Sequence, residues 1–344
     1  MSLAFSLRLL LLDVLGLNAL FRFLNRKKIL ILMYHGICDD GFTLLKGYDE
    51  RHIPASLFRK HLDYLRRKGY SFVSMSELVE IIRGQNEAKK IVALTFDDGF
   101  RNVVENAYPL LKEFQAKGCY YLITDLIGTD RLVWTDYIET VVRNSPKGVF
   151  ELTYKGDKIR YRLDTKASYE SAMKDIKAKL RKLSDKDRNE HMRQFENRET
   201  GNIPKEFLFA QWEQIGSLDK NVLEIGSHTK THPNCDRLSS EKEFEEELHD
   251  SRMEIEKRIG IPVRHFCYPA GAFNSEIIGR LKGYGYGSAV TTQPGLNDED
   301  ADLFSLKRVY VDESFLWFKA TTSGSYYAAQ RFKSFVKKTL GGGR

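Results

Sequence analysis

From Ile29 onward, short apolar runs alternate with amphipathic stretches along most of the chain. The apolar runs predict buried strands at 29–35, 91–96, 119–124, 222–228, 265–269, 286–291 and 305–311. The stretches between them predict helices, the clearest at 54–70, 102–118, 239–259 and 274–281. Because strands and helices alternate through so many units, the pattern favours an α/β fold with a barrel of parallel strands over an open sheet.

The stretch from about residue 146 to 204 interrupts this alternation. Its first part, FELTYKGDKIRYRL, predicts a hairpin that turns at Lys155, Gly156 and Asp157, and a highly charged segment then predicts one or two helices. We interpret 146–204 as an insertion on the rim of the barrel. It either shapes the substrate cleft or is a solvated decoration without a function.

The first 28 residues are apolar, but Arg8, Asp13 and Arg22 interrupt them, and a basic cluster at 26–28 ends the segment. An uncharged run of the roughly 18 residues that span a bilayer is absent. We expect an amphipathic helix at an anionic membrane surface, with an atypical secretory signal or a helix packed on its own domain as alternatives. The expected organisation is therefore 1–28 as this segment, 29–315 as the barrel and 316–344 as a C-terminal tail.

Composition and charge restrict the partners and the compartment that we expect for the protein. The chain has 344 residues, 42% of them hydrophobic, which suffices for a large core. Its net charge of +7 is mild, and its basic runs lack interleaved aromatic residues, so we expect no nucleic-acid partner. The four cysteines lie far apart without a CxxC pair, which is typical of reduced thiols. We expect a cytoplasmic protein, peripheral at the inner membrane.

Two aspartates, Asp97 and Asp98, follow the predicted strand at 91–96, and Gly99 comes next. In parallel α/β folds, catalytic groups gather where strands end. Neighbouring residues at a strand end point in different directions, so one carboxylate can face a metal ion and the other a water molecule. The alternative is that one aspartate only caps the helix that begins near Asn102.

Two histidines, His228 and His232, follow another predicted strand at 222–228. Imidazoles at i and i+4 can face one divalent ion, and Pro233 indicates that the turn that carries them is short. Two histidines with one carboxylate form a common ligand set of open catalytic metal sites. A pair of histidines in the core or on the surface is the alternative.

Taken together, TFDDG and HTKTH resemble the polysaccharide deacetylase family, carbohydrate esterase family 4, known for its NodB homology domain. The resemblance extends to LMYHGI, to EIGSHT and to FCYPAGAFN, and it covers roughly residues 29–312 apart from the insertion. It implies a distorted (β/α)7 barrel of the TIM-like type. It also implies a hydrolase that removes N-acetyl groups from a polysaccharide or a lipid-linked sugar and releases acetate.

The same resemblance implies roles for individual residues. Asp98, His228 and His232 match the metal ligands, with Zn2+ the expected ion and Co2+, Ni2+ or Mn2+ as alternatives. Asp97 matches the general base that activates the attacking water. The backbone N–H of Ala270 matches a donor to the oxyanion.

Two positions depart from the family pattern. Cys267 stands where an arginine usually orients the base, and Arg308 stands where a histidine usually serves as the general acid. Our hypothesis is that His35 donates the proton to the leaving amine and that Arg308 orients Asp97 or steadies the oxyanion. A structural histidine under the barrel floor is the alternative for His35.

Tyr268 and Trp212 are candidates for a sugar subsite, because aromatic faces pack on pyranose rings, and the barrel core is their alternative. Two other functions stay open for the chain. One is a barrel that binds glycan without turning it over, which the absence of the usual acid makes conceivable. The other is metal-dependent phosphoester hydrolysis, although a two-metal carboxylate cluster is not visible.

Overall fold

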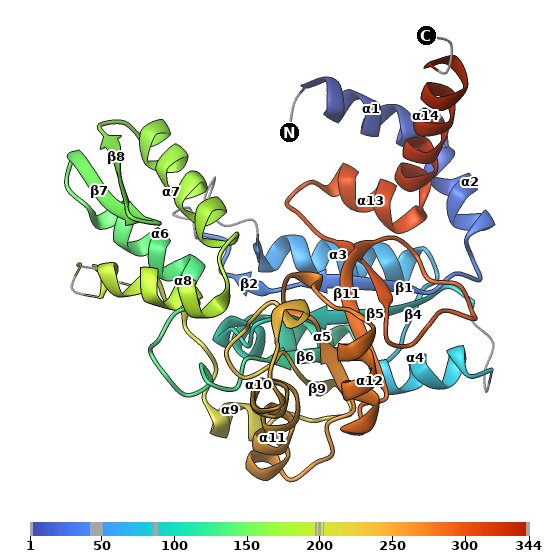
Figure 1. The fold of residues 1–344 in the computed structure, drawn as a ribbon. Helices are drawn as coiled ribbons and strands as arrows, with labels where there is room; N and C mark the ends of the chain where they lie inside the picture. Colours follow the sequence, from blue (N-terminus) through green and yellow to red (C-terminus); the bar gives the residue numbers. More distant parts are fainter. Residues whose placement is uncertain are drawn as a thin grey trace.

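Seven parallel strands close into a barrel in the computed structural model, which describes residues 3–41, 51–84, 89–196, 198, 201 and 203–341 (Figure 1). The strands follow one another around the ring in the order β1, β12, β11, β10, β9, β6 and β5, and β5 pairs again with β1. Their bounds are β1 Leu30–Tyr34, β5 Ile91–Phe96, β6 Gly118–Leu122, β9 Leu223–Ser227, β10 His265–Cys267, β11 Ser288–Pro294 and β12 Leu306–Tyr310. The prediction of a (β/α)7 barrel is confirmed.

Alternate side chains of the strands form two separate apolar clusters. Leu32, Leu94 and Tyr120 join the larger cluster, which includes residues of the surrounding helices. Ile31, Ala93, Tyr121 and Val290 instead share a smaller cluster. Strands that are not neighbours in the ring can meet only inside it, so the smaller cluster fills the barrel interior.

Helices pack around the barrel, and one of them lies at its amino-terminal end. The surrounding elements are α3 Ala55–Arg67, η1 Val103–Ala107, α5 Tyr108–Phe114, α9 Trp212–Gly216, α10 Glu241–Phe244, η5 Glu245–Asp250, α11 Ser251–Ile259 and α12 Ser275–Gly283. The helix α4, Met75–Ile82, places Met75 and Leu78 in the interior cluster, and the short strand β4, Ser71–Phe72, precedes it. A further small pair, β2 Gly36–Cys38 and β3 His52–Pro54, follows β1. The interior is therefore closed from below and open at the carboxyl ends of the strands.

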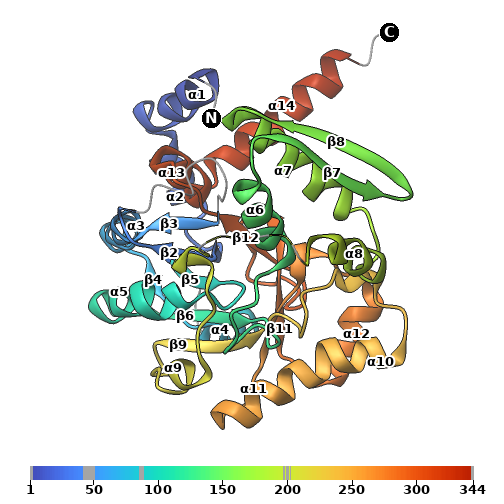
Figure 2. The same cartoon turned by 90° about the vertical axis from the view of Figure 1, so that its left-hand side faces the viewer.

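An appendage with its own core projects from the rim, and we call it the rim subdomain (Figures 1 and 2). It consists of α6 Trp134–Asn144, the antiparallel hairpin β7 Gly148–Tyr154 and β8 Asp157–Leu163, α7 Lys166–Leu180 and α8 Asp185–Met192, followed by the short turns η2 Arg193–Phe195 and η3 Lys205–Phe207. Ile138 and Val142 of α6 share a cluster with Phe150, Ile176 and Phe195. The rim subdomain thus begins at α6, which is earlier than the expected boundary near residue 146.

The two ends of the chain pack together on one side of the barrel (Figure 1). The helices are α1 Leu3–Val14, α2 Leu17–Leu24, α13 Phe315–Ser323 and α14 Ser325–Gly341. Asp13 pairs with Lys319 at 2.7 Å, and the Asn25 side chain donates to the Ser323 carbonyl at 2.9 Å. Phe318 of α13 is fully buried in the main core, so this part of the C-terminal segment belongs to the folded body.

The N-terminal helices nevertheless leave apolar side chains exposed. Leu11, Val14, Leu15, Phe23 and Leu24 are between 48% and 72% exposed. None of the described helices is long and apolar enough to cross a bilayer alone, whereas Ala4–Val14 and Leu17–Leu24, bent by 67°, meet the length and composition requirement as a pair.

Candidate active site

A cavity of about 820 Å³ opens at the carboxyl ends of the barrel strands. Asp97 and Asp98 follow β5, His228 and His232 follow β9, and His35 follows β1, and all five line the cavity. Residues up to 197 positions apart therefore meet because parallel strands deliver them to one edge.

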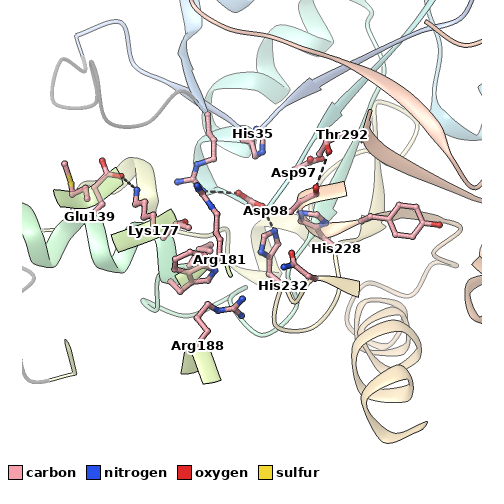
Figure 3. Close-up of a pocket in the computed structure, with 18 of the residues that line it drawn as sticks. His35, Asp97, Asp98, Glu139, Lys177, Arg181, Arg188, His228, His232 and Thr292 are labelled. Carbon is pink, nitrogen blue, oxygen red and sulfur yellow. Dashed lines mark hydrogen bonds and ion pairs between the residues drawn. The ribbon is translucent and has the colours of Figure 1, made fainter. Parts of the chain in front are cut away.

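Asp98, His228 and His232 form a compact set of metal-ligand atoms (Figure 3). Asp98 Oδ1 lies 3.5 Å from His228 Nε2 and 3.8 Å from His232 Nε2. Ligands bound to one Zn2+ at about 2.0–2.1 Å in a tetrahedron stand about 3.3 Å apart, so only small movements would bring all three onto one ion.

The other nitrogen of His228 explains how its ring is oriented. His228 Nδ1 lies 2.7 Å from the backbone carbonyl oxygen of Cys267. A carbonyl oxygen only accepts, so Nδ1 carries a hydrogen, and Nε2 is the ring nitrogen that faces Asp98 and would bind an ion. A hydrogen bond of this kind is the usual partner of a metal-bound histidine. The three residues therefore fit a divalent ion.

The loop that carries the histidines has a strained backbone and a buried clamp. Thr229 and His232 have φ values of 67° and 63°, in the left-handed region. The Glu247 carboxylate of η5 accepts the backbone N–H groups of Lys230 and Thr231, each at 2.9 Å, and the Thr231 hydroxyl at 2.6 Å. This one carboxylate holds the loop between the two histidines in place.

Asp98 also adopts a left-handed conformation, with φ of 75°, and Gly99 follows at 95°. This reversal turns Asp98 away from the direction of Asp97. Burial raises the pKa of Asp98, but the bond with His228 and the charges of the surrounding cations outweigh it and hold that pKa well below its usual range. Burial lowers the pKa of His232 to about 3, with His228 adding to the effect. Both groups are thus in the form that binds a cation.

Asp97 is held by Arg308 of β12. Arg308 Nη1 donates to Asp97 Oδ1 and Nη2 donates to Oδ2, each at 2.7 Å. The same guanidinium donates to the Thr291 carbonyl at 2.8 Å and the Thr95 hydroxyl at 3.0 Å. Burial alone raises the pKa of Asp97, but Arg308 outweighs burial and keeps that pKa below its ordinary value. Asp97 is therefore ionised and fixed in orientation.

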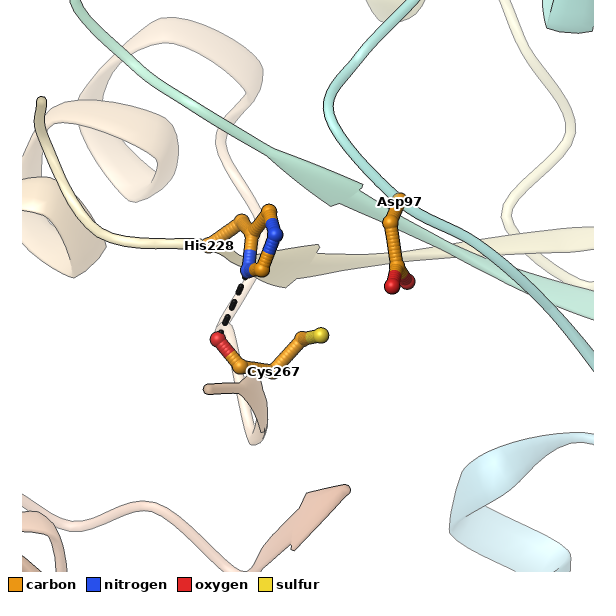
Figure 4. A group of neighbouring side chains, drawn as sticks. All are labelled: Asp97, His228 and Cys267. Carbon is orange, nitrogen blue, oxygen red and sulfur yellow. Dashed lines mark hydrogen bonds between the residues drawn. The ribbon is translucent and has the colours of Figure 1, made fainter. Parts of the chain in front are cut away.

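A second set of ligand-type atoms consists of Asp97, His228 and Cys267 (Figure 4). It does not fit a metal ion, because Arg308 already occupies both oxygens of Asp97 and lies 3.3 Å from Cys267 Sγ. Burial raises the pKa of the Cys267 thiol, whereas a metal needs the thiolate. The cation among these residues is the guanidinium itself.

The sequence profile of the family described as "Polysaccharide deacetylase" matches residues 84–289, which is more than half of the chain. The chain belongs to the polysaccharide deacetylase family. It is accordingly a deacetylase, a hydrolase. The matched range contains Asp97, Asp98, His228 and His232, whereas His35 and Arg308 lie outside it.

Individual relatives and solved structures agree with this assignment. YxkH, a Bacillus subtilis protein placed among the polysaccharide deacetylases, is 21% identical over 83% of this chain and 71% of its own length. The poly-β-1,6-N-acetyl-D-glucosamine N-deacetylase of Staphylococcus epidermidis is 25% identical over 30% of this chain and 39% of its own length. The structure of the Streptococcus pyogenes deacetylase PplD superposes with a TM-score of 0.55 and 20% identity, over 83% of this chain and 93% of PplD. At this identity the superposition shows a shared fold.

In this deacetylase, His35 lies in the cavity rather than under the barrel floor. The residue follows β1 at the carboxyl edge and is half-buried. Burial lowers the pKa of the His35 imidazole, although the charges of Asp98 and Asp97 act in the opposite direction. The alternative of a structural histidine at the closed end of the barrel is therefore wrong.

The structure separates the remaining candidates. Ala270 lines the cavity and has φ of 52°, and Arg308 is buried behind Asp97 and does not line it. Tyr268 lines the cavity, but its hydroxyl donates to the Phe304 carbonyl at 3.0 Å and its ring stacks on Phe273, so most of it is core.

Trp212 does not belong to the cavity. It begins α9 and packs against the main core, and its ring faces the guanidinium of Arg258 at 5.6 Å. The expectation that Trp212 lines a sugar subsite is wrong, because α9 lies outside the cavity wall.

The rim subdomain contributes a wall of the cavity, in line with the expectation that the insertion shapes the cleft, but sequence reasoning named none of its residues. Trp134, Lys174, Lys177, Arg181 and Arg188 line the cavity. Figure 3 shows Lys177, Arg181 and Arg188 opposite the barrel residues. The only sequence signal for these cationic residues is the high charge of the insertion. A surface helix that merely faces solvent is just as charged, so composition does not distinguish the two. Arg51, which donates to Asp98 Oδ2 at 3.4 Å and also pairs with Asp136 of α6, was missed as well, because no local motif marks it.

Proposed function

We propose that this deacetylase removes N-acetyl groups from an N-acetylated glycan or a lipid-linked sugar and releases acetate, with one divalent metal ion, most suitably Zn2+. The observation that carries the proposal is the juxtaposition of the Asp98, His228 and His232 ligand atoms with the ionised carboxylate of Asp97 in one cavity. The relatives from Staphylococcus epidermidis and Escherichia coli, both named as poly-β-1,6-N-acetyl-D-glucosamine N-deacetylases, support an N-acetylhexosamine as the reacting sugar.

Asp98 Oδ1 and the Nε2 atoms of His228 and His232 would hold the ion. Two imidazoles and one carboxylate suit Zn2+ and leave a position open for water or substrate. When bound, the ion supplies Lewis acidity, which lowers the pKa of a water molecule and polarises the acetyl carbonyl.

Asp97 accepts the proton of the attacking water. The water oxygen bonds to the acetyl carbon, and the carbonyl electron pair moves onto its oxygen. Arg308 keeps Asp97 ionised before this step. It also hydrogen-bonds to both carboxylate oxygens, so the carboxylate does not rotate away from the water.

The tetrahedral oxyanion requires a hydrogen-bond donor, and the leaving amine nitrogen requires a proton. The backbone N–H of Ala270 is the proposed donor to the oxyanion, since Ala270 lines the cavity in a left-handed conformation. His35 is the proposed proton donor to the nitrogen. When the C–N bond breaks, the carbonyl re-forms as acetate and the sugar keeps a free amine.

We also propose that the N-terminal helices bind an anionic membrane surface on its cytoplasmic side. Apart from Arg8, the exposed side chains of α1 and α2 are apolar, and Arg26, Lys27 and Lys28 follow one residue after α2. An apolar face with a basic end is the pattern of interfacial helices. Flotation of the chain with vesicles that contain anionic lipid tests this point, and equal flotation of a chain that starts at Ile29 would contradict it.

Acetate release from N-acetylated chitooligosaccharides and from undecaprenyl-linked N-acetyl sugars tests the enzymatic proposal. We expect release that a chelator abolishes and Zn2+ restores. Binding without acetate release from any of these substrates, with metal present, would overturn the proposal in favour of a glycan-binding barrel. Phosphate release would overturn it in favour of phosphoester hydrolysis.

A further inference from the structure

The wall of the cavity that faces the barrel residues carries several cationic side chains of the rim subdomain. Lys174 and Lys177 extend from α7, Arg181 follows α7 directly, and Arg188 belongs to α8. Figure 3 shows Lys177, Arg181 and Arg188 across the cavity from Asp97 and Thr292. We call Lys174, Lys177, Arg181 and Arg188 the cationic wall.

Only part of this charge is balanced inside the protein. Lys177 Nζ pairs with Glu139 Oε2 at 2.6 Å, and the other oxygen of Glu139 pairs with Arg143. The second carboxylate of this wall, Glu170, lies 4.0 Å from Lys166. In the part of the chain that the structure describes, no carboxylate pairs with Lys174 or Arg181, and both side chains are exposed to the cavity mouth.

Arg188 brings the positive charge deep into the cavity. The residue is only 6% exposed, and its guanidinium stands 5.3 Å from the ring centre of Trp134, which also lines the cavity. The cationic wall therefore reaches from the exposed mouth, where Lys174 and Arg181 lie, into the interior of the cavity.

The fixed negative groups of the barrel side already have cationic partners of their own. Arg308 balances Asp97, and Arg51 contacts Asp98 and Asp136. A bound divalent ion would add further positive charge next to Asp98. The cavity therefore gains most from a substrate that itself carries an anion close to the reacting sugar.

We propose that the cationic wall is a subsite for an anionic group of the substrate, a phosphate, a diphosphate or a carboxylate attached near the N-acetylated sugar. This inference rests on the proposed deacetylase function and names its substrate class. The anion contacts Lys174 and Arg181 at the mouth and faces Arg188 inside, while the acetyl group reaches Asp97 and the three ligand residues. Guanidinium and ammonium groups are the usual partners of such oxygens.

The test compares acetate release from matched neutral and anionic substrates. The neutral substrate is an N-acetylchitooligosaccharide, and the anionic ones are a diphosphate-linked N-acetylglucosamine and an oligosaccharide that alternates N-acetylglucosamine with a uronate. The variant is the double substitution Lys174→Gln with Arg181→Gln. Lys182→Gln is the matched control, because Lys182 is exposed next to Arg181 but does not line the cavity.

We expect the double variant to raise KM for an anionic substrate by roughly fivefold to tenfold, with kcat and the neutral substrate unchanged within twofold. Added salt should raise KM for the anionic substrate in the wild type more steeply than in the variant. A KM effect on the diphosphate-linked sugar alone identifies a lipid-type linker, and one on the uronate substrate alone identifies an anionic polysaccharide. Equal effects on neutral and anionic substrates, or none on either anionic substrate, overturn the inference.

A binding measurement separates this inference from the proposed function. Calorimetry with inorganic diphosphate should show binding to the Zn2+-loaded wild type and at least fivefold weaker binding to the double variant. If the wild type releases no acetate from any substrate, the proposed function fails. The cationic wall is then not a substrate subsite, even if it binds diphosphate. If acetate is released and diphosphate binds both proteins equally, only the inference fails.

Discussion

Arg308 and Asp97 form a buried, two-pronged ion pair in which each oxygen of the carboxylate receives one N–H of the guanidinium at 2.7 Å. The arginine comes from β12, 211 residues after Asp97, while the position from which family members usually supply an arginine holds Cys267. Arg308 Nη2 lies 3.3 Å from Cys267 Sγ, so the guanidinium fills the space beside the position where the usual arginine would start. The guanidinium that pairs with Asp97 thus comes from another strand.

Replacing Arg308 should lower turnover while leaving the metal site occupied. In Arg308→Gln, the effect of burial loses its strongest opponent, so the pKa of Asp97 should rise and the acid limb of the kcat/KM profile should move to higher pH. We expect kcat to fall about 100-fold and the Zn2+ content to stay near one. Removing one partner of a buried pair costs about 3–5 kcal/mol, so stability is measured in parallel.

The double variant Asp97→Asn with Arg308→Gln removes both charges and serves as the folding control. It should recover stability relative to Arg308→Gln but remain inactive. An Arg308→Gln enzyme with the wild-type pH profile would contradict the positioning role.

His35 is expected to affect proton delivery more than binding. His35→Asn keeps a polar side chain in the cavity but removes the imidazole, and we expect kcat to fall about 100-fold with little change in KM. Asp97→Asn should lose activity more completely. Near-normal turnover by His35→Asn would remove His35 from the mechanism.

The choice between the two sets of ligand atoms is tested by metal content. His232→Ala should lose Zn2+, because it removes one of three ligands of the set built on Asp98. Cys267→Ser should retain Zn2+, because Arg308 occupies the set that contains Cys267. Inductively coupled plasma mass spectrometry of the purified variants measures both outcomes, and loss of metal in Cys267→Ser would favour the other set.

Glu247 should act on metal affinity at a distance from the ion. Glu247→Gln keeps the size of the side chain but replaces one of its two acceptor oxygens with an NH2 group, so it can no longer accept from both the two backbone N–H groups and the Thr231 hydroxyl. Partners of this kind typically change metal affinity by about 10- to 100-fold, and we expect a weakening within that range in a Zn2+ competition assay. Glu246→Gln, next to it and half-buried, is the control and should bind Zn2+ normally, because Glu246 pairs with Lys242 instead.

His61 should make the fold sensitive to acid. Its ring is buried, stacks on Phe318 with ring centres 3.8 Å apart, and has a pKa lowered by burial to about 3. A pKa below the unfolded value of about 6.5 means that the unfolded state binds the proton more readily, so stability falls as pH drops below 6.5. From pH 7 to 5 the wild type should lose about 2 kcal/mol more than His61→Phe.

Urea denaturation at pH 8, 7, 6 and 5 measures this difference. At pH 8 both proteins should keep their respective stabilities, because His61 is neutral in either state. Parallel curves for the two proteins across this range would contradict the assignment.

The sequence predicts those features of the fold that depend on neighbouring residues, and it misses those that depend on contacts between distant segments. The apolar runs marked all seven barrel strands to within a few residues, because a fully buried parallel strand is apolar on both faces. The sequence did not predict the short helix α4 or the start of the rim subdomain at α6. Each is defined by the apolar cluster that it packs against, and that cluster forms only in the folded protein.

The amino-acid sequence by itself determined the barrel and the set Asp97, Asp98, His228 and His232. The two aspartates and His228 stand at the ends of apolar strands, His232 follows four residues after His228, and the chain carries all of them in recognisable motifs. Tertiary structure alone decided that Arg308 lies on Asp97, that Trp212 lies away from the cavity and that Arg181 and Arg188 face it. Such relationships join segments far apart in the chain, and their geometry is set by how strands close into a ring and how the rim subdomain packs on its edge. No local pattern of residues contains that information.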